Sequence, residues 1–305
     1  MASKTAQKNS NLSAAKKTKN DEFYTRIEDI ESELKHYKAH FKGKVVLCNC
    51  DDPEWSNFWR YFHANFDFLG LKRLVATYYA RNGQPSGILM CHDETRDING
   101  KPMVEKRALQ GDGDFRSPEC KDLLAEADII VTNPPFSLFR EFIALLMENE
   151  KKFLVIGDMN AIPNKEFFPL IQSNLIWLGI TSPEKFRTEI DENIYQKFGN
   201  KCWFTNLSHN RQNEEIPLFK TYKGNEVDFP FYDNYDGIEV QFVKNIPTDF
   251  LGMMGVPISF LTKYNPKQFN ILGIDRYIEG NKTPNKRFHI NGREKFARIV
   301  IRKIL

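Results

Sequence analysis

Between residues 44 and 180 the chain alternates short apolar segments with amphipathic ones, and this rhythm constrains the fold more than any other feature. The apolar segments predict buried strands. They cover 44–48, 73–78, 128–132, 153–156 and 176–180, with a last one at 202–207. Apolar residues at helical spacing predict helices over 26–40 and from Ser137, the expected cap, onward. Further helices are predicted over 54–68, over 117–126, where Ser117 and Pro118 mark the start, and over 165–172. Such alternation is typical of a sheet covered by helices on both faces, so we expect an α/β fold with a mostly parallel sheet.

The rest of the chain lacks this rhythm. Residues 1–20 are polar and predict a disordered arm, and residues 80–106 predict loop or irregular strand. After residue 207 the alternation stops, and 208–305 are expected to form a separate, irregular recognition segment. The predicted organisation is therefore an arm over 1–20, an α/β domain over 21–207 and a recognition segment over 208–305.

Charge is concentrated at the two ends. The formal net charge is only +3, yet residues 1–20 hold five Lys and no acid, and residues 281–305 hold eight Lys or Arg against one Glu. The body between them is therefore acidic. Because Lys and Arg bind nucleic acids by neutralising phosphates, basic ends on such a body favour a polyanionic partner.

Composition excludes several classes. A hydrophobic content of 41%, with 25 Phe and 11 Tyr, is that of a globular protein. No apolar stretch approaches the roughly 18 residues of a membrane span, and the start of the chain lacks a secretory pattern. Five scattered Cys give neither a disulfide framework nor a zinc site, and Cys91-His92-Asp93 lacks partners. We expect a cytoplasmic protein without a metal, a membrane contact or an obligate protein partner.

The segment DIIVTNPPF, Asp128–Phe136, carries the clearest chemistry. It places Asn133 directly after a buried strand, where ligands bind in open α/β sheets. Pro134 and Pro135 stiffen the turn and lack N–H donors, which leaves an amide oxygen and a proline carbonyl as acceptors. Two converging acceptors suit a planar amino group, and the ring of Phe136 suits a stacked base. The turn is therefore the candidate catalytic site.

This segment resembles motif IV of the S-adenosylmethionine-dependent amino-methyltransferases. From about residue 20 onward, the chain resembles one group of them, the EcoRI-type adenine-N6 DNA methyltransferase family. The resemblance rests on NDEFYT (20–25), VLCNCDDP (46–53), GDGDFRS (111–117), VTNPPFSLFR (131–140), YDNYD (232–236) and MGVP (254–257).

The resemblance implies a class I, Rossmann-like methyltransferase fold over 21–207. It also implies transfer of a methyl group from S-adenosylmethionine to N6 of an adenine flipped out of duplex DNA, leaving S-adenosylhomocysteine, in a restriction-modification type of system of bacterial or phage origin. The implied catalytic residues are Asn133, Pro134, Pro135 and Phe136. The implied cofactor-binding residues are Phe23, Tyr24, Thr25, Asn49, Cys50, Asp51, Asp52, Pro53, Asp114 and Phe115.

Two alternatives stay open at this point. RNA or protein-glutamine N-methyltransferases share the Asn-Pro-Pro-aromatic turn but commonly lack a basic segment of this length after the last strand. A DNA-binding protein with an inactive cofactor site is the other, because 49–53 stands where methyltransferases usually have a glycine-rich loop. No acidic residue ends the 73–78 segment either, although a ribose-binding carboxylate is common there.

Overall fold

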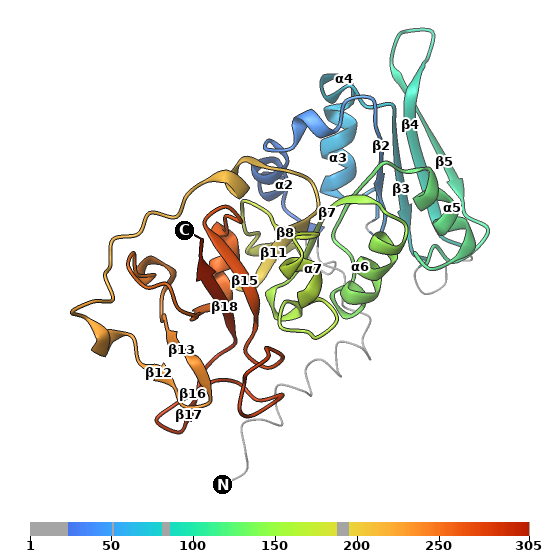
Figure 1. Cartoon of the computed structure of the whole chain (residues 1–305). Helices are drawn as coiled ribbons and strands as arrows, with labels where there is room; N and C mark the ends of the chain where they lie inside the picture. Colours follow the sequence, from blue (N-terminus) through green and yellow to red (C-terminus); the bar gives the residue numbers. More distant parts are fainter. Residues whose placement is uncertain (1–23, 51, 81–85, 188–194, 305) are drawn as a thin grey trace. The chain divides into compact units, whose positions relative to one another are not determined.

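A computed structural model describes residues 24–50, 52–80, 86–187 and 195–304 (Figure 1). The chain divides into two compact units. Unit 1 comprises Met1–Asp158 and Thr181–Leu207, and unit 2 comprises Met159–Ile180 and Ser208–Leu305. Residues 159–180, which the sequence analysis places in a continuous domain over 21–207, thus lie in unit 2.

Unit 1 is built on a mixed sheet with the strand order β5-β4-β3-β2-β6-β7-β11. The central four strands are parallel: β2 (Val45–Cys48), β3 (Arg73–Tyr78), β6 (Ile129–Thr132) and β7 (Lys152–Asp158). Antiparallel strands flank them: β4 (Ile88–Arg96), β5 (Pro102–Ala108) and β11 (Lys201–Thr205). The predicted α/β architecture is confirmed, with parallel strands at the centre and antiparallel ones at both sides.

Two helices of unit 1, α3 and α5, begin at serine side chains that cap them. Ser56 accepts from the backbone N–H groups of Phe58 and Trp59 at the start of α3, and Ser117 accepts from Cys120 N–H at the start of α5. The helices are α2 (Ile27–Leu34), α3 (Asn57–Ala64), α4 (Phe66–Leu69), α5 (Pro118–Glu126) and α6 (Phe139–Glu148). A 3-10 turn, Lys38–His40, follows α2.

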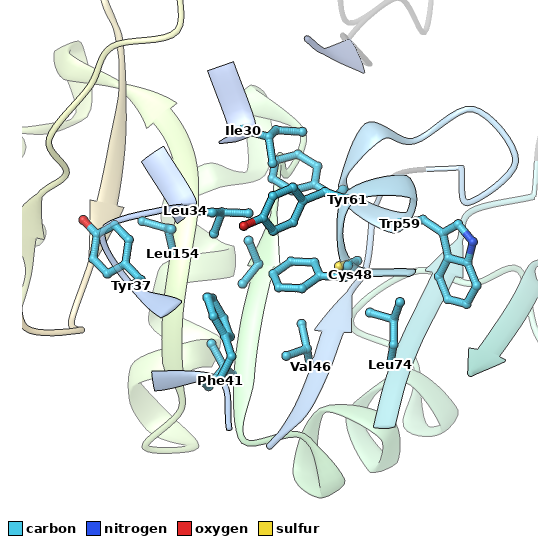
Figure 2. Packing of buried hydrophobic residues seen from close by; sticks show 14 of the residues in the cluster. Ile30, Leu34, Tyr37, Phe41, Val46, Cys48, Trp59, Tyr61, Leu74 and Leu154 are labelled. Carbon is cyan, nitrogen blue, oxygen red and sulfur yellow. The ribbon is translucent and has the colours of Figure 1, made fainter. Parts of the chain in front are cut away.

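Alternate residues of the parallel strands form the main core. Val46, Leu74 and Leu154 point to one face of the sheet, where they meet Ile30 and Leu34 of α2 and side chains of α3 (Figure 2). The intervening buried residues of the strands face the other side, where α5 and α6 lie (Figure 1). Because both faces are covered, the strands are apolar almost throughout, which is why the sequence reveals them.

A smaller sheet completes unit 1. It has the order β1-β9-β10 and is antiparallel throughout. Its strands are β1 (Tyr24–Thr25), β9 (Lys185–Arg187) and β10 (Tyr195–Lys197). Tyr24 and Thr25 thereby pair with Arg187 and Phe186, more than 150 positions further along the chain.

Unit 2 is more regular than its composition predicts. A five-stranded mixed sheet has the order β12-β13-β14-β18-β15. The strands are β12 (Phe231–Tyr232), β13 (Tyr235–Glu239), β14 (Met254–Pro257), β15 (Phe269–Ile274) and β18 (Arg298–Lys303). The unit also contains α7 (Phe168–Gln172), β8 (Trp177–Leu178) and a hairpin of β16 (His289–Ile290) and β17 (Arg293–Glu294). The expectation of an irregular segment over 208–305 is therefore wrong for the sheet.

A buried ionic network lies within this second sheet. The guanidinium of Arg298 donates from Nε to both carboxylate oxygens of Glu239, at 3.1 and 3.0 Å. The Tyr232 hydroxyl donates to the same carboxylate. All three side chains are buried. Burial, and then the neighbouring Glu239 carboxylate, raise the pKa of Tyr232, so its hydroxyl stays protonated and remains a donor.

Two local predictions need correction. Residues 88–108 form a hairpin of β4 and β5, whose register shifts between His92 and Arg96, so the alternative of a loop is wrong and that of an irregular strand is closer. Every residue of β5 is exposed, so this edge strand lacks the alternation that reveals a half-buried strand. Ser137 is not the cap of α6 either: it lies in a 3-10 turn, Phe136–Leu138, and Leu138 is the cap residue.

Candidate active site

The strand order places a topological switch point between β2 and β6. From β2 the chain passes to β3 on one side of it, and later returns to β6 on the other side. In open α/β sheets, ligands bind at the carboxyl ends of the strands at such a point. The segments that follow β2 and β6 are 49–53 and 133–136, so both predicted turns lie at this position. A buried hydrogen bond joins the strand ends, since the Thr132 hydroxyl donates to the Asn49 carbonyl.

The turn after β6 has the form that its sequence predicts. Asn133 is 8% exposed and Pro134 is buried, while Pro135 and Phe136 are partly exposed. The Pro135 carbonyl accepts from the Leu138 N–H at 2.9 Å, which closes the 3-10 turn. Among the residues described, no hydrogen bond uses the Pro134 carbonyl. Of the two proline carbonyls, it is that of Pro135 that closes the 3-10 turn.

The turn after β2 replaces a glycine-rich loop with other residues. Cys50 has a φ of 67°, a left-handed conformation that favours glycine. Asn49 is 3% exposed, and its side-chain Oδ1 has no hydrogen-bond partner among the described residues. Asp52 and Pro53 are buried, and Asp52 accepts from the Glu54 N–H at 3.0 Å. Asp51 lies outside the described residues. The Asn49 amide oxygen is therefore a buried acceptor that this turn offers to a ligand.

The 111–117 loop lies against the end of β3. The Asp112 carbonyl accepts from the Ala80 N–H at 2.6 Å. Gly113 has a φ of 82°, and a Cβ there would lie 2.3 Å from the Tyr78 carbonyl oxygen, so only glycine allows this approach. The loop brings Asp112 and Asp114 to the carboxyl end of a strand that has no acidic residue of its own.

Within that loop, Asp114 forms an ion pair that its sequence does not predict. Arg116 donates to its carboxylate from Nε at 2.9 Å and from a terminal nitrogen at 2.6 Å. The same guanidinium reaches Glu141 at 3.3 Å. Hydrogen bonding from Arg116 lowers the pKa of Asp114, so the carboxylate is ionised at neutral pH. Phe115 is buried with its ring 5.1 Å from that of Phe142, nearly perpendicular to it.

Strand β1 brings Tyr24 and Thr25 to the start of α3. The Asn57 side chain donates to the Thr25 carbonyl at 2.7 Å. Thr25 is 1% exposed, and its hydroxyl has no hydrogen-bond partner within the part of the chain that the structure describes. The guanidinium of Arg187 lies 5.2 Å from the Tyr24 ring centroid and 5.5 Å from that of Trp55. Phe23 lies outside the described residues.

Two charged residues at this edge of the sheet were not identified from sequence. Asp158 ends β7, and Lys201 begins the antiparallel β11 directly opposite it. Their side chains form an ion pair at 2.9 Å. A single Lys before a buried strand is a common pattern, so only the long-range pairing of β7 with β11 reveals its position.

The Cys91-His92-Asp93 segment lies elsewhere, in β4. His92 is buried, 3.0 Å from a ring nitrogen of His63 and with its ring centroid 3.9 Å from that of Phe66. Burial, and then the charge of His63, lower its pKa. In the described ranges, no group of three or more His, Cys, Asp or Glu is arranged to hold a metal ion, and no helix is long and apolar enough to cross a membrane.

A mixed α/β sheet with an Asn-Pro-Pro-Phe turn at its switch point is typical of a methyltransferase-like protein. The family described as "Adenine-specific methyltransferase EcoRI" matches residues 11–304. Type II methyltransferase M.EcoRI of Escherichia coli is 43% identical, with 95% of each chain covered. Type II methyltransferase M.MpnI of Mycoplasma pneumoniae is 37% identical over 95% of this chain and 97% of its own. No solved structure matches. The chain belongs to the EcoRI family of adenine-specific methyltransferases.

Proposed function

We propose that this adenine-specific methyltransferase is a site-specific enzyme of class I fold that acts on N6 of an adenine flipped out of duplex DNA. The observation that carries the proposal is the Asn133–Phe136 turn at the switch point, joined through Thr132 to the turn after β2. The names of its relatives, type II methyltransferases, favour a function in restriction and modification.

The residues around the switch point fit S-adenosylmethionine, which supplies an electrophilic methyl group on sulfur. The Asn49 amide oxygen and the Thr25 hydroxyl are buried polar atoms without partners in the described chain, which a polar ligand would satisfy. We assign the cofactor's adenine amine to the Asp114 carboxylate and its ring to the apolar side of Phe115. Tyr24, Cys50, Asp52 and Pro53 would complete the pocket, with Phe23 and Asp51 assigned on the sequence resemblance alone.

The turn after β6 would bind the target. In the proposal, Asn133 Oδ1 and the Pro134 carbonyl accept one hydrogen bond each from the two N–H groups of the adenine amine, while Pro135 fixes the turn. These two hydrogen bonds direct the lone pair of the amine nitrogen out of conjugation with the ring. The nitrogen, otherwise a weak nucleophile, thereby becomes reactive. Phe136 would stack on the flipped base, whose removal from the duplex costs a few kcal/mol.

DNA binding would involve the basic parts of the chain. Residues 281–305 hold eight Lys or Arg against one Glu. Arg298 is buried and paired with Glu239, so we assign phosphate neutralisation to the other basic residues of this segment and to the lysines of 1–20. We assign target recognition to 208–305, the methyltransferase domain to 21–207 and phosphate contacts to the arm. Binding should then weaken steeply with salt, because neutralised phosphates release counterions.

Sequencing of plasmid DNA from cells that express the chain tests this proposal. We expect N6-methyladenine at one position of one short recurring sequence. Cells expressing the empty vector are the control. If the plasmid is unmethylated while the protein methylates RNA, the first alternative is correct. If the plasmid is unmethylated and calorimetry detects no binding of S-adenosylmethionine, the protein has an inactive cofactor site.

The assigned role of Asp114 gives a prediction for cofactor affinity. We expect Asp114→Ala to raise the dissociation constant of S-adenosylmethionine about 10- to 100-fold, because a hydrogen bond to a charged group contributes roughly 1.5–3 kcal/mol. Isothermal calorimetry measures the change. Arg116→Ala is the matched control, since it breaks the same ion pair but keeps the carboxylate. Equal loss in both variants would show that the ion pair, and not the carboxylate, supports binding.

A further inference from the structure

Lys201 is a buried lysine beside the candidate catalytic turn. It begins β11, in antiparallel register with Asp158 at the end of β7. Because β6 and β7 are parallel, the carboxyl end of β7 and the start of β11 lie at the same edge of the sheet as the turn after β6. The Lys201 side chain is only 5% exposed, and its ammonium lies 2.9 Å from an Asp158 oxygen.

The ammonium of Lys201 also contacts Phe136. Its nitrogen lies 3.7 Å from the ring centroid of Phe136 and 5.1 Å from that of Phe198. Both distances are within the range of cation–π attraction, which strengthens when the cation is shielded from water. The rings of Phe186 and Phe198 lie 6.3 and 6.4 Å from Phe136, steeply inclined to it. Phe136 is thus bounded by two rings and a cation.

This arrangement is not needed to join the strands. A buried ammonium costs free energy unless it is paired, whereas an apolar side chain at the start of β11 would pack without that cost. Here Asp158 balances the charge, and Asn200 donates to both oxygens of Asp158 at 2.7 and 2.8 Å. The carboxylate is therefore fixed, and it holds the ammonium next to Phe136.

We propose that Lys201 is a positioning residue for the target base and acts through Phe136. The ammonium fixes the orientation of the ring and draws π-electron density toward itself. A purine stacking on Phe136 would then meet a ring of fixed orientation and reduced electron density. The pairing with Asp158 keeps the net charge near zero where the target nitrogen becomes cationic. This inference rests on the proposed function, which assigns Phe136 to the flipped adenine.

Three substitutions separate the cation from the packing. Lys201→Met keeps length without charge, Lys201→Gln keeps a donor for Asp158 without charge, and Lys201→Arg keeps the charge. In a duplex with the recognition sequence and 2-aminopurine in place of the target adenine, we expect Met and Gln to lower the flipped-base fluorescence about 3- to 30-fold. On the same duplex with adenine at the target position, they should lower kcat/KM by a similar factor. Arginine should retain most of both signals. Lys152→Met, at the exposed start of β7, is the matched control.

A double-mutant cycle tests whether Lys201 acts through Phe136. In a Phe136→Leu background, Lys201→Met should cause little further loss, because no ring remains for the cation to orient. Fluorescence and kcat/KM at parental levels in Lys201→Gln would overturn the proposal. So would a Lys201→Met effect on either quantity that is as large in the Phe136→Leu background as in the parental protein. Cofactor affinity, measured by calorimetry, checks folding of each variant. Failure of the proposed function would appear separately, as methylation that persists in Asn133→Ala.

Discussion

Asn133→Ala is expected to lower the single-turnover methylation rate about 100-fold or more while changing DNA affinity little. The substitution removes one of the two acceptors assigned to the target amine. Those hydrogen bonds strengthen as the nitrogen becomes cationic, so the loss falls on the transition state. The magnitude follows that of other single positioned hydrogen-bonding groups in active sites. Rapid-quench assays with saturating DNA and cofactor measure the rate.

Phe136→Ala is the informative comparison for this variant. It removes stacking of roughly 1–3 kcal/mol per base, so capture of the flipped base should fall together with the rate. Asn133→Ala should instead leave the 2-aminopurine signal of the flipped base largely intact. Methylation at nearly the parental rate in Asn133→Ala would show that the turn after β6 is not the catalytic site.

Glu239→Ala is expected to destabilise unit 2 by about 3–5 kcal/mol, the usual effect of leaving one partner of a buried ion pair uncompensated. The substitution leaves the Arg298 guanidinium buried without its carboxylate and removes the nearer of two acceptors of the Tyr232 hydroxyl, the other being the Gly255 carbonyl. Urea denaturation followed by fluorescence measures the change.

Glu294→Ala is the matched control for this substitution. Its carboxylate is exposed and lies 3.9 Å from Arg287, and surface pairs of this kind contribute at most about 1 kcal/mol. If the two variants unfold at the same urea concentration, the network around Glu239 contributes nothing special to stability.

Local sequence signals predict those parts of unit 1 whose structure depends mainly on residues close together in the chain. Strand β3 has the predicted bounds, and α5 begins and ends as predicted, because Ser117 and Pro118 mark its start. The positions of the two turns at the switch point also follow from sequence, since each comes directly after an apolar strand that is buried at its carboxyl end. The Asn-Pro-Pro-Phe motif has a backbone that its two prolines restrict, so its shape needed no long-range information.

Side-chain directions within loops and contacts between distant segments could not be predicted. Asp114 and Arg116 form an ion pair in a short loop, where no sequence periodicity indicates the direction of a side chain. This pair involves the carboxylate that the proposal assigns to the cofactor. Lys201 reaches Phe136 only because β11 pairs antiparallel with β7. In unit 2, β18 comes from the end of the chain and lies between β14 and β15, an order that no local pattern contains.

The chain crosses between its two units three times, after Asp158, after Ile180 and after Leu207. A single truncation at residue 207 therefore leaves α7 and β8 attached to the first unit without the remainder of the second. A chimaera that exchanges the second unit with that of a relative must replace 159–180 and 208–305 together. A gene fusion with a single junction at residue 207 would join residues 159–180 of one protein to the 208–305 segment of the other, so the second unit would be built from two different proteins.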